Sequence, residues 1–510
     1  MNLVIGSGPA GVSAAMALIA RGQSVTLLDG GKTLPENLRD RQNTFADKAA
    51  DTWSDEDALN WQQPQLEHSG DLAMRFGSTH AQTPLDDLFA PETPFSGRSS
   101  HASGGLSNVW GAAVLPYRQQ DIAAWPVTAD ELASHYQAVS RFMPISGTSG
   151  GDLQDLFTAF DAAALTALPS GPQASALLDR LADRREALRA AGVFFGPSRQ
   201  AVRDSCFLCG QCLHGCPWSL IYSAEQTLTE LRRSERFTYR PGAIVTGLSK
   251  SGEACRIHLS DGEVLSADKV FLATGVYETA RLVLGTMSDS ESHLTLQDSR
   301  QFFLPMLHRW RATSDPSKRP LHTLAKAFVE IDNADVSPYL THSQIYSWNE
   351  YYAREMSANY GRGIPGSGAL FRMISKRLLV AQTFLHSDHC DQVELRLDQK
   401  TNRLKTSILP NADMLRTIDR AAATLGKALS QAGLQPLTFA KRVEAPGASF
   451  HSGGTLPMSA SPDRLQTDPL GRLSGFENLH IVDASVLPSI PASTITFTVM
   501  ANAHRIGSLA

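Results

Sequence analysis

Four closely spaced cysteines are the residues of this chain best suited to redox chemistry. Cys206, Cys209, Cys212 and Cys216 are followed by Pro217, so the run reads Cys-x-x-Cys-x-x-Cys-x-x-x-Cys-Pro. This is the bacterial iron–sulfur spacing, in which soft thiolates bind iron and one short loop wraps around a cluster. The spacing therefore predicts a metal site that passes single electrons.

Spacing alone leaves the type of site open. In two-cluster ferredoxins the fourth cysteine of this spacing binds the other cluster, and this chain has only Cys255 and Cys390 beyond the run. One cluster could be [4Fe–4S] on four thiolates or [3Fe–4S] on three, or it could recruit a lone cysteine. A run without metal is a further alternative. Zinc and disulfides fit less well, because zinc sites usually pair two separated knuckles and disulfides are rare in a reducing compartment.

A glycine motif near the N-terminus predicts a dinucleotide site. Gly6, Gly8 and Gly11 form Gly-x-Gly-x-x-Gly between a predicted strand at 2–5 and a predicted helix at 12–20. Gly6 permits a tight turn, Gly8 lets the backbone approach a pyrophosphate, and Gly11 lets the helix pack close to the strand. The N-terminus of the helix offers unpaired N–H groups and a positive dipole end to the phosphates.

An acidic residue completes this motif. Asp29 follows a second predicted strand at 23–28 and lies 18 residues beyond Gly11. This is roughly where an acidic side chain binds a ribose hydroxyl. The strand–helix–strand order predicts an α/β domain, but the motif does not distinguish FAD from NAD.

The composition is that of a globular protein without a strongly charged surface. The chain has 510 residues, of which 42% are hydrophobic and 19% charged, and a net charge of −5. Two or more domains are expected, and nothing favours nucleic acid or an anionic membrane. No stretch reaches the roughly 18 to 20 uninterrupted apolar residues of a membrane span. The first apolar run lacks a basic leader, so we expect a cytoplasmic protein, with export alongside a signal-bearing partner as the alternative.

Local patterns predict further elements. Thr128 is a suitable N-cap for a helix at 128–143, and a long helix is expected at 414–432. Residues 243–270 are typical of a β-meander with an Asp-Gly turn. Residues 32–100 carry little helix or strand signal and are expected to be irregular.

The C-terminal tail resembles a known family. His451 begins the sequence His-Ser-Gly-Gly-Thr, Asn478 begins Asn-Leu-His-Ile-Val-Asp-Ala-Ser-Val-Leu-Pro, and residues 493–496 read Ser-Thr-Ile-Thr. These segments are similar to the tail of the glucose–methanol–choline (GMC) oxidoreductases. Residues 104–111 and 273–275 extend the resemblance into the N-terminal half.

This resemblance implies that the dinucleotide is FAD and that the reaction is the oxidation of an alcohol. A base takes the hydroxyl proton while a hydride passes from carbon to the flavin. His451 occupies the position of the family's catalytic histidine, and histidine suits the role because its unperturbed pKa, about 6.5, lies near working pH. Where the family has a second His or Asn, this chain has Thr494, which can hydrogen-bond a substrate but is no base at neutral pH. The predicted catalytic residues are His451 and Thr494.

The motif and the resemblance together predict the surroundings of the FAD. These residues lie in the glycine turn, at the end of the second strand, in the Gly/Ser-rich stretch and in the tail. The predicted cofactor-binding residues are Gly6, Gly8, Gly11, Asp29, Gly104, Gly105, Ser107, Asn108, Trp110, Val245, Asp483 and Ala484.

The cysteine run is also similar to a segment of GMC-type sugar and polyol dehydrogenases that carry iron–sulfur clusters, and Tyr222 fits its continuation. Several GMC oxidases have a similar Cys-rich stretch, so the resemblance leaves the metal content open. Polar and aromatic side chains at 342–346 and 348–352 favour a sugar-like ligand, although an alternating β-strand also accounts for them.

These features predict an FAD-dependent dehydrogenase that oxidises a CH–OH group of a small sugar-like or polyol substrate. Electrons would leave through the cluster to a cytochrome, a ferredoxin-like protein or a quinone. One alternative is an oxygen-using GMC oxidase with structural cysteines. Another is an inactive FAD electron-transfer subunit, against which the presence of His451 argues.

The predicted fold is α/β, with a Rossmann-like FAD-binding domain interleaved with a substrate domain of a sheet and covering helices, in a GMC-like α+β arrangement. The FAD-binding domain is expected at 1–120, 200–290 and 441–510, and the substrate-binding domain at 121–199 and 291–440. Catalysis is expected at their junction, where clefts between domains commonly bind ligands.

Overall fold

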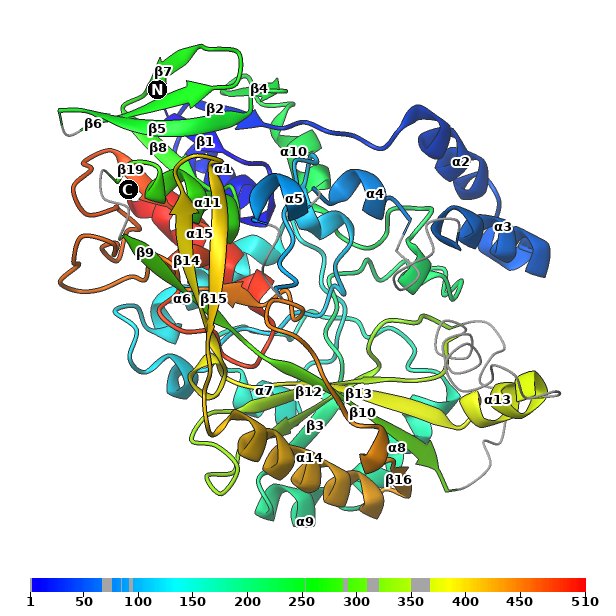
Figure 1. Ribbon diagram of the computed structural model, residues 1–510. Coiled ribbons are helices and arrows are strands. Elements are labelled where there is room, and N and C mark those ends of the chain that lie inside the picture. Colours follow the sequence, from blue (N-terminus) through cyan, green and yellow to red (C-terminus); the bar gives the residue numbers. More distant parts are fainter. Residues whose placement is uncertain are drawn as a thin grey trace.

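Two sheet-based units make up the chain, one in the upper and one in the lower half of Figure 1. Both chain ends lie in the upper unit. The computed structural model describes residues 2–66, 76–83, 85–90, 95–252, 254–287, 292–309, 321–349 and 367–510.

The upper unit is built on a parallel sheet. Its strands are short runs rich in Val, Leu and Ile, and Leu3 and Val4 are completely enclosed, as expected when both faces of a parallel sheet are covered. The hydrogen-bonded order is β19-β8-β1-β2-β4, and neighbouring strands run parallel. The strands are β1 (Asn2–Ile5), β2 (Val25–Asp29), β4 (Phe237–Pro241), β8 (Lys269–Leu272) and β19 (Leu479–Ile481).

Helices from both ends of the chain meet on this sheet. α1 (Pro9–Ala20) follows β1 directly, and α15 (Ile495–Leu509) packs along it. The approach is so close that a Cβ added at Gly507 would lie 2.8 Å from the carbonyl oxygen of Ala14. The tail is thereby fixed beside the N-terminal glycine motif. α10 (Ala224–Leu231) and α11 (Val276–Leu284) complete this part of the unit.

The predicted β-meander is confirmed. β5 (Val245–Ser251), β6 (Ala254–Leu259) and β7 (Val264–Ser266) pair antiparallel in that order. The Asp-Gly turn lies between the last two strands, where Gly262 has a φ of +89° that favours glycine.

The lower unit is built on an antiparallel sheet with the order β16-β10-β13-β12-β11-β3, and β17 pairs with β10. Alternate side chains, including Phe302, Val329 and Ala381, enter a core with α8, α9 and α14. The opposite face carries the intervening side chains. The elements are β3 (Val193–Pro197), β10 (Gln301–His308), β11 (Ala327–Ile331), β12 (Thr341–Tyr346), β13 (Leu378–Phe384), β16 (Leu434–Pro436), β17 (Arg442–Val443), α8 (Pro172–Ala182), α9 (Arg185–Ala190) and α14 (Met414–Gln431).

A smaller antiparallel sheet joins the tail to the strands that lead into the lower unit. Its order is β15-β14-β9-β18. Because β18 begins directly after His451, this pairing holds the predicted catalytic histidine beside the lower sheet. The strands are β9 (His293–Asp298), β14 (Gln392–Asp398), β15 (Arg403–Leu409) and β18 (Ser452–Gly453).

The helix predictions at 128–143 and 414–432 are confirmed as α6 (Ala129–Ser140) and α14. The hydroxyl of Thr128 accepts a hydrogen bond from the Glu131 N–H, and the Glu131 carboxylate accepts one from the Thr128 N–H, which is a capping box. The short helices α7 (Asp152–Leu156) and α13 (Ser367–Ser375) belong to the remaining connections.

The expectation that residues 32–100 are irregular is wrong. Phe45, Trp53, Trp61 and Phe76 form a buried aromatic cluster that covers the polar helices on one side. Tertiary packing rather than helix propensity stabilises such segments, so their sequence carries little helical signal. The helices are α2 (Glu36–Ala46), α3 (Asp55–Leu66), α4 (Ser78–Ala81) and α5 (Leu85–Leu88).

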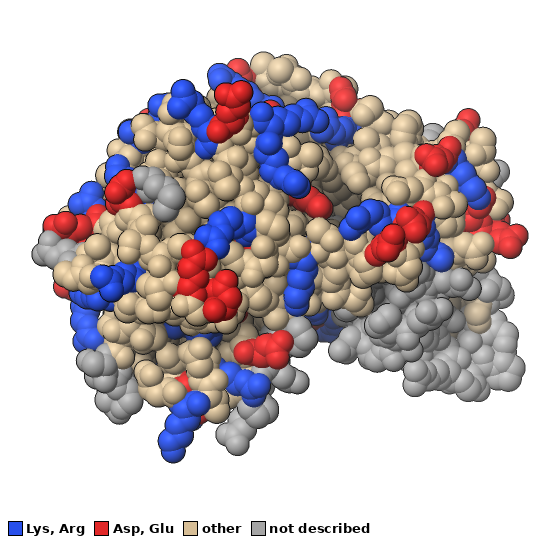
Figure 2. Space-filling view, turned by 90° about the horizontal axis from the view of Figure 1, so that it is seen from above, with Lys and Arg blue, Asp and Glu red and all other residues tan. Residues whose placement is uncertain are grey.

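Along the chain, strands of the upper parallel sheet alternate with strands of the lower antiparallel sheet. Interleaved domains require such an order. The domain bounds remain a prediction. Positive and negative side chains are interspersed on the face in Figure 2, so this face presents no extended surface of one sign. Within the described ranges, no helix is long and apolar enough to span a membrane.

Candidate active site

A cavity of about 310 Å³ opens at the carboxyl ends of the parallel strands, where open α/β sheets bind their ligands. Its wall combines the β1–α1 turn, the end of β2, the β8–α11 turn and the start of α15. Predicted cofactor-binding residues that line it are Gly6, Gly8, Asp29, Gly105, Val245, Asp483 and Ala484.

The glycine turn has the geometry that its motif predicts. Gly6 has a φ of +101°, and a Cβ there would lie 2.4 Å from the Ala273 carbonyl oxygen. A Cβ at Gly11, which lies behind the turn, would lie 1.9 Å from the Gly6 carbonyl oxygen. A Cβ at Gly8 would meet no atom of the described residues within 4 Å. The backbone at Gly8 is therefore open to the close approach of a pyrophosphate.

Asp29 is held firmly at the cavity wall. Its carboxylate accepts hydrogen bonds from the Ser7 hydroxyl at 2.8 Å, the Gly31 N–H at 3.2 Å and the Tyr239 hydroxyl at 3.0 Å. Burial raises the pKa of Asp29 above its ordinary value, and these hydrogen bonds oppose that shift. The carboxylate lines the cavity, and its contact with a ribose remains a prediction.

Most of the predicted FAD contacts in residues 104–111 hydrogen-bond to neighbouring segments and do not line the cavity. Ser107, Asn108 and Trp110 each hydrogen-bond to residues 222–224, and Gly104 donates its N–H to the glycine turn. These four were predicted as FAD contacts. They lie off the cavity wall because their polar atoms fix this loop against its neighbours.

Asp483 joins the tail to the β8–α11 turn. Its Oδ2 accepts hydrogen bonds from the Gly275 N–H at 3.0 Å and the Thr279 hydroxyl at 2.6 Å, and its Oδ1 accepts one from the Ser485 N–H at 2.9 Å. Burial raises the pKa of this carboxyl group, which the three hydrogen bonds oppose. Asp483 and Ala484 therefore bring the tail backbone to the cavity.

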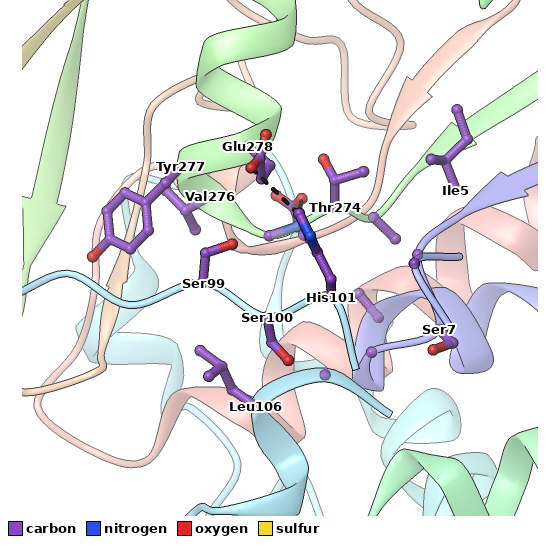
Figure 3. Close-up of a pocket in the computed structure, with 18 of the residues that line it drawn as sticks. Ile5, Ser7, Ser99, Ser100, His101, Leu106, Thr274, Val276, Tyr277 and Glu278 are labelled. Carbon is purple, nitrogen blue, oxygen red and sulfur yellow. Dashed lines mark hydrogen bonds and ion pairs between the residues drawn. The ribbon is translucent and has the colours of Figure 1, made fainter. Parts of the chain in front are cut away.

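Sequence reasoning missed part of the cavity wall. His101 Nε2 lies 3.7 Å from Glu278 Oε1, and Figure 3 shows the two side chains pointing toward each other. Arg98, Ser99 and Tyr277 also line the cavity. No motif marks these residues, since they come from segments far apart in the chain that only the fold brings together.

His451, the predicted base, lies between two residues of this wall, Phe450 and Ser452. Its Nδ1 is enclosed and has no hydrogen-bond partner among the described residues, whereas its Nε2 is not enclosed in this way and is the open nitrogen. The ring stacks on Phe384 with centroids 4.6 Å apart. Burial lowers the pKa of His451 to about 3, and the neighbouring His342 acts in the same direction. The imidazole is therefore neutral at ordinary pH.

Thr494, the predicted second catalytic residue, is the N-cap of α15. It is buried, and its hydroxyl oxygen accepts a hydrogen bond from the Leu115 N–H at 2.7 Å. The hydroxyl is thus engaged by the backbone, and it ties the tail helix to a neighbouring segment. Its catalytic role stays a prediction.

The four cysteines of the run line one small apolar cavity together with His322 and other residues. All four are free thiols. Burial raises the pKa of Cys206 to about 11 and also raises the pKa of Cys216. Thiolates at these positions would therefore need positive charge beside them.

Two backbone donors and one buried lysine lie near these sulfur atoms. The Leu220 N–H donates to Cys216 Sγ at 3.3 Å, and the Thr323 N–H donates to Cys212 Sγ at 3.4 Å. Lys326 Nζ is buried without a hydrogen-bond partner in the described part of the chain. Burial lowers the pKa of Lys326 to about 7, and the nearby thiols oppose this shift. Hydrogen bonds and positive charge both favour anionic sulfur.

In the chain as described, no three His, Cys, Asp or Glu side chains meet closely enough to hold a single metal ion. In an iron–sulfur cluster each thiolate binds its own iron, so the sulfurs surround the group instead of meeting at one point. The iron–sulfur site remains a prediction.

Comparisons with known proteins identify the C-terminal part of the chain. Residues 385–503 match the GMC oxidoreductase family model. The fold is similar to that of the crystal structure of pyridoxine 4-oxidase from Mesorbium loti, with a TM-score of 0.59, 16% identity, and coverage of 99% of this chain and 98% of that chain. No curated protein matches the chain. The predicted GMC-like α+β fold is confirmed, and the matched domain supports an FAD-dependent oxidoreductase that acts on CH–OH groups.

Proposed function

We propose that this FAD-dependent oxidoreductase, whose residues 385–503 match a GMC oxidoreductase domain, oxidises a sugar-like or polyol alcohol. We also propose that the electrons leave through an iron–sulfur cluster. The observation that carries the proposal is the convergence of Cys206, Cys209, Cys212 and Cys216 on one cavity. An oxidase that delivers both electrons directly to oxygen has no need of such a site.

The residues of the larger cavity fit an FAD. Gly8 leaves room for the pyrophosphate, the N-terminus of α1 favours its charge, and Asp29 suits a ribose hydroxyl. Asp483 and Ala484 would lie beside the flavin part. When bound, the FAD accepts the hydride that leaves the substrate carbon.

His451 is the proposed base. Its Nε2 is the open nitrogen, and burial keeps the ring neutral and able to accept a proton. His451 Nε2 would take the hydroxyl proton of the substrate as the carbon–oxygen double bond forms, and a bound FAD would supply the hydride acceptor.

The lower sheet supports a polar, hydroxyl-rich substrate. Gln301, Gln344 and Gln382 lie on the face opposite α14. Gln382 Nε2 donates to Gln301 Oε1 at 2.6 Å, and the Tyr346 hydroxyl donates to Gln344 Oε1 at 3.1 Å. Linked amides present both donors and acceptors to hydroxyl groups, which a site for an apolar alcohol does not need. The aromatic residues expected at 350–352 lie outside the described residues.

Groups around the cysteines support an anionic cluster. The two N–H···S hydrogen bonds and the buried Lys326 would offset the negative charge that a thiolate-bound cluster carries. A cluster passes electrons singly, so the natural acceptor would be a cytochrome, a ferredoxin-like protein or a quinone.

Iron and acid-labile sulfide analysis, with EPR on anaerobically purified protein, tests the cluster. We expect about three to four iron atoms per FAD, as a [3Fe–4S] or [4Fe–4S] centre holds. Cys212→Ser should lose the iron, whereas the matched control Cys255→Ser, which changes another buried thiol on β6, should keep it. Iron far below one atom per FAD, or full iron in Cys212→Ser, would overturn the proposal.

An oxygen-using oxidase is the second candidate, favoured by the structural similarity to a protein that is named an oxidase. The cysteines would then be structural. Rapid peroxide formation in air by protein that contains no iron would support this candidate. Slow reaction with oxygen and fast reduction of a one-electron acceptor would support the dehydrogenase. An inactive electron-transfer subunit would show no flavin reduction with any alcohol.

A further inference from the structure

A buried histidine–carboxylate pair lies on the same face of the lower sheet as the three glutamines. His342 Nδ1 lies 2.7 Å from Glu330 Oε1, and the two residues are directly opposite each other on β12 and β11. Both side chains are fully enclosed. A carboxylate so placed accepts the Nδ1–H of the imidazole and leaves a lone pair on Nε2, which is the arrangement that orients histidines in catalytic triads.

Three polar atoms in this region lack partners. They are His342 Nε2, Glu330 Oε2 and His451 Nδ1, each buried without a hydrogen bond to any described residue. Leaving a buried polar atom unpaired costs roughly 1–3 kcal/mol, so such atoms in native proteins generally have a partner, often a buried water.

Phe384 contacts both histidines. Its ring stacks on His451 at 4.6 Å and on His342 at 6.1 Å between centroids. Phe328 closes another side of His342, edge-on at 4.9 Å. Glu330 and His451 are two titratable groups that interact with His342. The two unpaired nitrogens therefore belong to two imidazoles that share Phe384 as a neighbour and interact electrostatically.

We propose that Glu330 and His342 form a buried relay to His451, in which a water molecule joins His342 Nε2 to His451 Nδ1. The inference rests on the proposed alcohol oxidation and adds two positioning residues to it. In the relay, His451 Nδ1–H donates to the water, the water donates to His342 Nε2, and His342 Nδ1–H donates to Glu330. His451 then has its lone pair on Nε2, facing the substrate.

The relay also gives the proton a destination. When the substrate O–H bond breaks, its proton binds His451 Nε2 while the hydride leaves carbon for the FAD. The Nδ1 proton of His451 moves to the water, a water proton moves to His342 Nε2, and the His342 Nδ1 proton moves to Glu330. His451 and the water end neutral, and one proton has passed from the substrate to the carboxylate. A histidine that burial makes a weak base needs this support.

Anaerobic stopped-flow reduction of the FAD by substrate, in water and in D₂O mixtures, tests the relay. His342→Leu and Glu330→Gln should slow reduction about 10- to 100-fold, as loss of a partner behind a catalytic histidine does, with little change in substrate affinity. The wild type should show a curved dependence of rate on deuterium fraction, because several protons move, and both variants a linear one. Ser343→Ala is the matched control, since it removes a buried hydrogen bond to Thr383 on the same strand and should keep the curvature.

Two results would overturn the relay while leaving the alcohol oxidation intact. One is a rate per bound FAD in His342→Leu within about threefold of wild type, well short of the expected loss. The other is a linear deuterium dependence in the wild type. If no alcohol reduces the wild-type flavin, the proposed function itself fails.

A high-resolution crystal structure tests the relay without activity. A water within about 2.7–3.2 Å of both His342 Nε2 and His451 Nδ1 is expected. Apolar atoms filling the space between the two rings would contradict the inference.

Discussion

Acidification should leave the reduction of the flavin almost unchanged, because His451 stays neutral. Burial lowers the pKa of His451 to about 3. The neutral imidazole is the form that accepts the hydroxyl proton, so a depressed pKa extends activity toward lower pH. We therefore expect the second-order rate constant for reduction to be level from pH 7.5 down to about pH 5.

The expected difference is large enough to measure. A histidine with the ordinary pKa of about 6.5 would be only about 3% neutral at pH 5, which is roughly a thirtyfold loss of active base. With a pKa of about 3, His451 is about 99% neutral at the same pH. One experiment can therefore distinguish a rate constant that stays level from one that falls about thirtyfold.

Anaerobic stopped-flow spectroscopy at low substrate concentration gives this rate constant, since it reports the ionisation of the free enzyme. FAD content and circular dichroism at each pH verify that the protein stays loaded and folded. A fall centred near pH 6.5 in folded, FAD-loaded protein would refute the assignment of His451 as a buried, neutral base.

The lowered pKa of His451 should also make the folded protein less stable as the pH falls. His451 binds fewer protons in the folded than in the unfolded state between about pH 3 and pH 6.5, so folding stability is lost as pH falls below 6.5. At pH 5 this loss amounts to at most about 2 kcal/mol relative to pH 7.5. His451→Gln should abolish most flavin reduction and should also lose less stability than wild type over this pH interval in denaturant titrations. Equal losses would contradict the shift.

Three further substitutions separate folding from function. Gly11→Ala should destabilise the apoprotein, because its Cβ would lie 1.9 Å from a carbonyl oxygen. Gly8→Ala has open space around its Cβ, so it should keep the melting temperature of the apoprotein and weaken FAD binding. Equal effects of the two substitutions in thermal melts and flavin titrations would contradict the turn geometry. Thr494→Val removes the hydroxyl bonded to Leu115, so it should cost about 1–2 kcal/mol of stability in denaturant titrations but slow reduction less than tenfold. A loss of a hundredfold or more would restore Thr494 as a catalytic residue.

Local motifs predicted the parts of the site that depend on backbone geometry. Gly6 and Gly11 could be interpreted from sequence because a tight turn and close helix packing tolerate only glycine there. Gly8 could be interpreted because a bare backbone leaves room for a pyrophosphate. Asp29 followed from its position at the end of a strand. The meander and the capped helix after Thr128 were similarly local, and both are present.

The remaining parts depend on contacts between distant segments. The helices between residues 32 and 100 pack on aromatic side chains that are widely spaced along this segment, and Trp218 joins them from elsewhere in the chain. Ser107 and Asn108 were expected at the cofactor, but their polar atoms are used by residues 223 and 224. Glu330 and His342 are 12 residues apart, and only the pairing of β11 with β12 brings them together. No sequence period or motif carries that information.

The most direct test of the proposed function is anaerobic mixing of the FAD-loaded protein with a panel of sugars, polyols and simple alcohols, followed by visible absorbance. We expect at least one polyhydroxylated substrate to bleach the flavin in wild type and not in His451→Gln, with a carbonyl product formed in proportion to the flavin reduced. Unchanged flavin absorbance with every alcohol, or equal bleaching in His451→Gln, would contradict alcohol oxidation at this site.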